Sequence, residues 1–426
     1  MSIAYTAGLS AAPSFFRNIP DGRPSDRGLS WVQLASILCV AVFTRLLLWS
    51  VRPPDMSIFL EPWFAHIVHY GPVRAFAHPF SNYEPAYLYL LALGSLASAA
   101  LTPMTIIKII SVCGTLLMTL ALADLLKAAR AEPRAACILL ALPSVMFNDA
   151  LFAQCDALWV GSCIFGLAAM MRGRTLCAMV WCGVAIAFKA QAAFVAPVIV
   201  GAMIGQRAPL WQWTVPGLVF LTTLIPPLLL GWPAMKLLTV YLDQAAWDQI
   251  PGRLANPWMF ATMFADHASR PWFWLGYATA GAAAAALALL AVRNARNPRM
   301  LMLLAALAGT ALPFLLPKML ERYYFLGDVM TLALALSFRN RPAVYAMLGI
   351  QMASLLSHVT TMYFFYDPYP ALIGVPFAAA SLAIMCGLVG AGSSRVGGRW
   401  LLARMPIVVQ SERALAVPSG ESLPAA

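Results

Sequence analysis

Long apolar runs constrain this chain more than any other feature of its sequence. They recur between residues 31 and 390, and the whole chain is 61% hydrophobic but only 11% charged. A membrane-spanning helix takes about 20 apolar residues, whereas a soluble domain carries about 25% charged residues. This composition excludes a soluble globular enzyme, a disordered chain and a disulfide-rich secreted fold. The runs also lack the period-two pattern of outer-membrane barrel strands.

The runs predict an all-α, polytopic membrane protein of about 11–13 transmembrane helices. Three segments, at 134–148, 175–188 and 190–205, are shorter than a full span, and we expect them to be short, tilted or re-entrant. Two connecting stretches, at about 51–83 and 232–272, are long, aromatic and acidic. We expect both to form external loops that carry short helices.

Basic residues indicate the orientation of the chain. The net charge is +11, and arginines cluster in two short loops, at 293–299 and 339–341. Because basic residues collect in cytoplasmic loops, the long aromatic loops should face the opposite side. We therefore expect a protein of the bacterial inner membrane whose active site faces the periplasm. The domain 31–390 would lie between a cytoplasmic tail at 1–30 and a partly disordered one at 391–426.

The loop at 127–134 conflicts with this orientation. It is also basic, and simple alternation from a cytoplasmic N-terminus places it outside. One early span is therefore misassigned or does not cross, and the number of crossings before residue 134 stays open.

Asp55 is the first candidate catalytic residue. Two prolines precede it and end the first predicted span, so Asp55 should lie at the membrane surface. A carboxylate in this place can act as a general base on a sugar hydroxyl. It can equally cap a short amphipathic helix that runs to about Tyr70. At the other end of the loop, Asn82 and Glu84 flank Tyr83, which can also belong to an aromatic belt.

Ionisable residues within or beside the apolar runs form a second group of candidates. They are Asp149, Asp156, Lys189, Glu321, Arg322 and Asp328. Each costs roughly 2.5–3.5 kcal/mol at membrane depth, so such residues usually face a polar cavity or pair with one another. Arg322 and Lys189 are natural phosphate ligands. The pairs Asp156–Lys189 and Glu321–Arg322 can alternatively serve packing alone.

Five short motifs follow one another along the chain. They are Asp-Met-x-x-Phe-Leu-x-x-Trp at 55–63, Asn-Tyr-x-Pro-x-Tyr-Leu-Tyr-Leu-Leu at 82–91, Gln-Cys-Asp-Ala-Leu at 154–158, Phe-Lys-Ala-Gln at 188–191 and Pro-Lys-Met-Leu-Glu-Arg-Tyr at 317–323. Together they resemble the GT-C superfamily of polyprenyl-phosphate-sugar glycosyltransferases, especially bacterial relatives of the GPI and N-glycan mannosyl- and glucosyltransferases. The chain departs from the family pattern at Ala86 (usually proline), Ala153 (usually glycine) and Leu320 (usually histidine).

The resemblance implies a role for each motif. The aspartate of the first external loop is the catalytic base of this family, and that role falls on Asp55. With the buried charges, the motifs give the expected substrate-binding set: Glu61, Asn82, Tyr83, Gln154, Asp156, Lys189, Gln191, Glu321, Arg322 and Tyr323. The implied reaction moves a hexose, mannose or glucose, from a polyprenyl-phosphate sugar to a lipid-linked glycan, a polysaccharide or another periplasmic acceptor.

Two other functions share some of these features. A transporter or flippase of lipid-linked saccharides would also combine many spans with buried charges, but it should show internal inverted repeats, which the sequence lacks. A catalytically inactive subunit of a polysaccharide assembly complex would fit the departures at Ala86, Ala153 and Leu320. We expect no required cofactor and no metal site, since none of the cysteines forms a CxxC pair. A divalent metal is possible but unsupported, and we expect no nucleic-acid partner.

Overall fold

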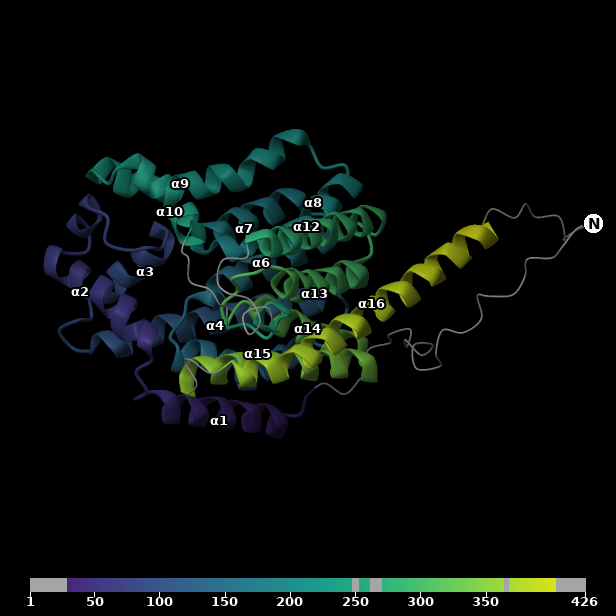
Figure 1. Cartoon of the computed structure of the whole chain (residues 1–426), viewed down its shortest axis with the longest axis horizontal. Coiled ribbons are helices and arrows are strands. Elements are labelled where there is room, and N and C mark those ends of the chain that lie inside the picture. Colours follow the sequence, from purple (N-terminus) through teal and green to yellow (C-terminus); the bar gives the residue numbers. More distant parts are fainter. Residues whose placement is uncertain (1–28, 247–252, 261–269, 364–367, 404–426) are drawn as a thin grey trace, which may run out of the picture.

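The computed structural model describes residues 29–246, 253–260, 270–363 and 368–403, and this part of the chain is helical without strands. The predicted tail at 1–30 lies almost wholly outside the described residues. The part of the predicted tail at 391–426 that follows residue 403 also lies outside them. In Figure 1 the long helices lie side by side along the molecule. The short helices α2 (Glu61–Tyr70) and α3 (Pro85–Ser95) gather at one end of it, at the left of the view.

Seven helical segments of the described chain are long and apolar enough to cross a membrane. They are α1 (Trp31–Leu48), α4 (Pro103–Ala128), η7 with α9 (Leu210–Thr214 and Val215–Leu230), α12 (Arg270–Arg293), α13 (Pro298–Leu315), α15 (Arg341–Tyr363) and α16 (Tyr369–Ala403). The predicted all-α, polytopic architecture is therefore confirmed. The helix α16 continues to Ala403, past residue 390, where we expected the last span to end.

The remaining apolar helices are shorter than a full span. They are α3, α6 (Asp156–Met171), α7 (Thr175–Phe188), η6 with α8 (Ala190–Val195 and Ala196–Gly205) and α14 (Phe325–Phe338). The segment predicted at 134–148 is a broken helix. Its first part, η4 (Pro133–Ala141), meets α5 (Pro143–Met146) and η5 (Phe147–Leu151) at a bend of 60°. The bend falls at Pro143, because proline lacks the backbone N–H that would continue the hydrogen bonds of the helix.

Two glycines spaced four apart let the short helix α8 approach α12 closely. A Cβ atom at Gly201 would lie 2.2 Å from the carbonyl oxygen of Ala288, and one at Gly205 would lie 2.4 Å from that of Val292. Small residues at this spacing are a common way to pack helices in lipid, where no hydrophobic driving force brings them together. The contact anchors α8, whose preceding turn carries residues of the site described below.

Substitution of Gly201 by alanine should separate these two helices. The added methyl group meets backbone, which cannot rotate away, and overpacking of this kind costs about 1–3 kcal/mol. Gly281→Ala is the matched control, because Gly281 lies on α12 with open space around its Cβ position. We expect a lower apparent melting temperature for Gly201→Ala and no loss for Gly281→Ala. Equal melting temperatures for the two variants would contradict the close packing.

Candidate active site

The end of α1 is held by a lysine that brings the chain toward Asp55. Lys108 of α4 is fully buried, and its ammonium donates hydrogen bonds to the carbonyls of Leu48, Trp49 and Val51 at 2.9, 2.8 and 2.8 Å. The last carbonyls of a helix lack partners within it, so the lysine satisfies them and closes α1. Four residues later the chain reaches Asp55, which precedes the π-helical turn η2 (Met56–Leu60). Such turns are frequent at functional sites.

Asp55 is bound by two side chains from distant parts of the sequence. The amide of Gln154 donates to its Oδ2 at 3.0 Å, and the Arg322 guanidinium donates to the same oxygen at 2.9 Å. Within the described part of the chain, both of these bonds end on Oδ2, and the side chain of Asp55 stays 30% exposed. The carboxylate is thus fixed in orientation while Oδ1 takes no part in either bond.

Arg322 contacts three carboxylates from one buried position. Besides Asp55, its Nη1 donates to Glu321 Oε1 at 3.0 Å, and its Nε lies 3.9 Å from Asp156 Oδ2. Burial alone would lower the pKa of Arg322, but the charges of Asp55 and Glu321 outweigh that effect and hold the pKa well above its ordinary value. Arg322 therefore links the loop at 51–83 to the segment between α13 and α14.

Asp156, at the start of α6, is the second anion of the cluster. The Lys189 ammonium lies 2.6 Å from its Oδ1, the Trp159 indole donates to that oxygen at 2.8 Å, and the Asn148 amide donates to Oδ2 at 2.9 Å. Burial by itself would lower the pKa of Lys189, but the Asp156 charge raises it above its ordinary value. This lysine stays protonated and holds a fixed positive charge beside Arg322.

Tyr83 lies between the loop and these charges. Its hydroxyl donates to Gln154 Oε1 at 3.4 Å, and the Lys189 ammonium lies 5.1 Å from the centre of its ring. Trp63 packs on the same ring at 5.0 Å. Burial raises the pKa of Tyr83 to about 12, so the phenol remains a neutral hydrogen-bond donor over the physiological range.

Gln154 itself is positioned through its backbone. The Ser111 hydroxyl of α4 donates to its carbonyl oxygen, and the preceding residue, Ala153, has a φ of 52°. That conformation suits glycine, and it costs a residue with a Cβ about 1–2 kcal/mol. The strained turn thus points the Gln154 side chain at Asp55.

The structure brings most of the predicted site residues together. Asp55, Tyr83, Gln154, Asp156, Lys189, Glu321 and Arg322 form the cluster described above, which we call the Asp55 cluster. Gln191 lies beside Tyr323, whose ring is 6.3 Å from that of Phe194. Asn82 lines a neighbouring cavity.

Glu61, another predicted residue, does not belong to the Asp55 cluster. Its carboxylate is instead paired with Arg52, because α2 begins at Glu61 and turns it toward the chain that precedes Asp55. Sequence reasoning in turn did not select Lys108, or Arg45 as the buried partner of Asp149 at 2.6 Å. Each is an ionisable side chain within an apolar run, which is the signal that could have found it. The described residues contain no group of three or more acidic, histidine or cysteine side chains suited to a metal.

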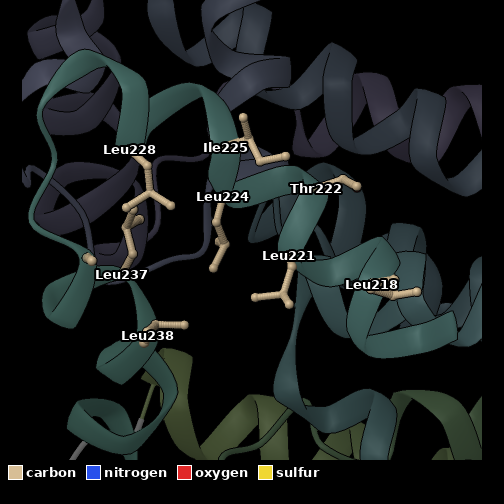
Figure 2. Close-up of a pocket in the computed structure, with 9 residues that line it drawn as sticks. Leu218, Leu221, Thr222, Leu224, Ile225, Leu228, Leu237 and Leu238 are labelled. Atoms are coloured by element: carbon tan, nitrogen blue, oxygen red, sulfur yellow. The ribbon is translucent and has the colours of Figure 1, made fainter. Parts of the chain in front are cut away.

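An apolar groove adjoins this end of the molecule. It lies between α9 and α10 (Ala234–Ala246) and has a volume of about 390 Å³. Figure 2 shows Leu221, Leu224 and Ile225 of α9 around this groove, with Leu237 and Leu238 of α10. No charged side chain lines it, so it offers a surface for a hydrocarbon chain rather than for chemistry.

Residues 68–205, about a third of the chain, match the family described as Alpha-(1->6)-mannopyranosyltransferase, N-terminal domain. No curated protein matches the chain. The match confirms the predicted class of enzyme, a glycosyltransferase, and does not favour the transporter alternative. The matched segment includes Tyr83, Gln154, Asp156 and Lys189, whereas Asp55 precedes it.

Substitution of Ala153 by glycine should stabilise the protein and leave the site intact. It removes the left-handed strain, which offsets the greater freedom of glycine in the unfolded chain, and we expect a gain of about 0.5–1 kcal/mol. Ala157→Gly, within the helix α6, is the control and should be destabilising. The apparent melting temperatures of the two variants, compared with that of the unsubstituted protein, measure these changes in stability. A lower melting temperature for Ala153→Gly would contradict the strained turn.

The buried carboxyl group of Glu84 should make the stability of the protein depend on pH. The side chain is buried, and neither carboxylate oxygen has a hydrogen-bond partner among the described residues. Burial raises its pKa from 4.5 to about 8. The folded state therefore holds this proton over an interval in which the unfolded state has lost it, so stability should fall as pH rises from 4.5 to about 8.

The variant Glu84→Gln isolates this effect. We expect its melting temperature to exceed that of the unsubstituted protein by an amount that grows as pH rises from 5 to 8 and then levels off. Scans at pH steps across that range measure the difference. A constant difference would show that Glu84 does not titrate in this interval.

Proposed function

We propose that the chain transfers a hexose, with mannose favoured by the family match, from a polyprenyl-phosphate sugar to a hydroxyl of a glycan acceptor. The observation that carries the proposal is the Asp55 cluster. In it the partly exposed Asp55 carboxylate contacts Arg322, and Arg322 lies near Asp156, the partner of Lys189. A transfer of this kind needs a base for the attacking hydroxyl and positive charge for the departing phosphate. Asp55 supplies the first, and Arg322 with Lys189 supplies the second.

Donor binding begins with a competition at Arg322. In the free protein its Nη1 is bound to Asp55 and Glu321. A phosphate makes the same charge-assisted, two-pronged contact with a guanidinium that a carboxylate makes. The donor phosphate would replace Asp55 there, and the released carboxylate would turn to the acceptor while Glu321 keeps Arg322 in place.

The transfer then proceeds in one displacement. The acceptor oxygen attacks the anomeric carbon of the donor sugar and forms the new glycosidic bond as its proton passes to Asp55. The bond between the anomeric carbon and the phosphate oxygen breaks, and polyprenyl phosphate leaves with both electrons. In-line attack inverts the anomeric configuration, and the cations stabilise the charge that develops on the phosphate. No step of this scheme runs through a metal or a cofactor.

The surroundings of the Asp55 cluster suit a lipid-linked donor. The apolar groove between α9 and α10 can take the prenyl chain, and the candidate spans place the protein in a bilayer. We propose the bacterial inner membrane, with the Asp55 cluster facing the periplasm, since the basic loops at 293–299 and 339–341 favour the cytoplasmic side. The acceptor is a lipid-linked glycan, a polysaccharide or another periplasmic molecule.

Asp55→Asn tests the base directly. Asparagine keeps the size of the side chain and its contact with Gln154, but it cannot take up the proton of the acceptor. We expect transfer to be slower by at least about a hundredfold, within the roughly 10²–10⁴-fold that general-base catalysis contributes. Transfer is measured in a reconstituted system with thermal stability alongside. Glu61→Gln is the control and should have a much smaller effect, since Glu61 pairs with Arg52. Near-normal transfer by Asp55→Asn would remove Asp55 as the base.

Arg322→Lys tests the phosphate contact. Lysine keeps the charge but loses the planar fork, so it can bind a phosphate only as a point charge. We expect the KM for the donor to rise about tenfold, which corresponds to roughly 1.4 kcal/mol. Arg172→Lys is the matched control, because Arg172 forms an ion pair with Asp124 outside the Asp55 cluster. An unchanged donor KM in Arg322→Lys would leave Arg322 as a packing ion pair.

A further inference from the structure

A polar cavity lies next to the Asp55 cluster, between the end of the first external loop and the helix α10. Its volume is about 180 Å³, and its lining includes Ser81, Asn82, Trp232, Lys236 and Asp243. We call it the α10 pocket. Lys236 and Asp243 lie seven residues apart on α10 and thus on one face of that helix, whereas Leu237 and Leu238 line the apolar groove. The helix therefore separates a polar cavity from an apolar one.

The polar groups of the α10 pocket match hydroxyls rather than phosphate. Lys236 donates, Asp243 accepts, and Ser81 and Asn82 do both. The two charges are opposite, so the pocket does not select an anion as Lys189 and Arg322 do. A hydroxyl-rich neutral group would satisfy donors and acceptors together.

Trp232 gives the α10 pocket an aromatic wall with an unused donor. It is only 2% exposed, and its indole N–H has no hydrogen-bond partner in the described part of the chain. Its ring packs on that of Phe80 at 5.7 Å. A buried donor without a partner costs about 1–3 kcal/mol, so a ligand hydroxyl that reaches it recovers part of this energy. A flat aromatic face beside polar groups is typical of small-ligand sites.

The size of the α10 pocket limits its ligand. Cavities for drug-sized molecules measure about 300–1,000 Å³, so 180 Å³ fits a smaller group, such as a single sugar ring.

The α10 pocket adjoins the proposed base through one residue. Asn82 lines the pocket, and the next residue, Tyr83, donates to the Gln154 amide that binds Asp55. A ring held in the pocket therefore lies beside the tyrosine that borders the reacting groups. The donor phosphate, in contrast, belongs at Arg322 and Lys189, neither of which lines the α10 pocket.

We propose that the α10 pocket is the acceptor subsite and holds one hexopyranose ring of the acceptor. The proposal rests on the proposed function, because it assigns a place to the second substrate of that reaction. The ring can belong to a free saccharide or to a lipid-linked one.

Binding of glycosides in the absence of donor tests this subsite without relying on transfer. The protein is placed in lipid nanodiscs free of glycoside detergents, and the probes are a methyl hexoside and the same hexose on a long-chain alcohol. We expect Asp243→Asn and Trp232→Phe to weaken binding of both probes about 3- to 10-fold, the range of one hydrogen bond. The probe that binds the unsubstituted protein more tightly identifies the acceptor as free or lipid-linked.

The matched controls are an aspartate-to-asparagine and a tryptophan-to-phenylalanine substitution outside the α10 pocket. Asp124 pairs with Arg172, and Trp211 is 59% exposed on η7, so Asp124→Asn and Trp211→Phe should leave binding unchanged. In transfer assays, Asp243→Asn should raise the KM for the acceptor by a similar factor and leave the KM for the donor unchanged.

Two outcomes overturn the assignment of the α10 pocket. One is glycoside binding that is equal in Asp243→Asn, Trp232→Phe and the unsubstituted protein. The other is a rise in the KM for the donor alone, which would move the pocket to the donor side. A third outcome separates this proposal from the proposed function. If the unsubstituted protein binds the probes as expected but transfers no hexose from any polyprenyl-phosphate donor, the proposed function is wrong, whereas the α10 pocket remains a site that binds sugar.

Discussion

The contact between Arg322 and Asp55 is the interaction on which the site depends. It joins the loop at 51–83 to a segment 267 residues later in the chain, and the same guanidinium also compensates Glu321 and faces Asp156. Removing one partner of a buried ion pair costs about 3–5 kcal/mol, because the other charge is left uncompensated. Removal of Arg322 would therefore leave the buried Glu321 carboxylate without its cation.

Several features of the fold serve to keep this contact in place. Lys108 closes α1 just before Asp55, and Ser111, one turn further along α4, holds the backbone of Gln154. The helix α4 thus fixes the base and the amide that orients it from one rigid element. A site built on neighbouring positions of one helix keeps its geometry even though the loop that carries Asp55 is long.

Much of this architecture can be predicted from the sequence, because a bilayer requires long apolar helices and makes buried charges costly. Apolar runs predict the helices, and ionisable residues within or beside them, such as Asp156 and Lys189, mark the site. The pairs Asp156–Lys189 and Glu321–Arg322, which were expected from the sequence, are both present in the structure. The contact between Arg322 and Asp55 could not be predicted, since these two residues meet only through tertiary packing. Glu61 lies close to Asp55 in sequence, yet the start of α2 turns it to Arg52. The position of Lys108 within an apolar run marks it as a candidate, but its partners could not be predicted because they are backbone carbonyls.

The central claim is that the donor is a sugar on a lipid phosphate. The most direct measurement is transfer by the purified protein in a bilayer, with polyprenyl-phosphate mannose, polyprenyl-phosphate glucose and the corresponding nucleotide sugars offered separately. We predict transfer from a polyprenyl-phosphate hexose, with inversion at the anomeric carbon, and none from a nucleotide sugar. Transfer from a nucleotide sugar, or no transfer from any lipid-linked donor by a folded protein, would contradict the account.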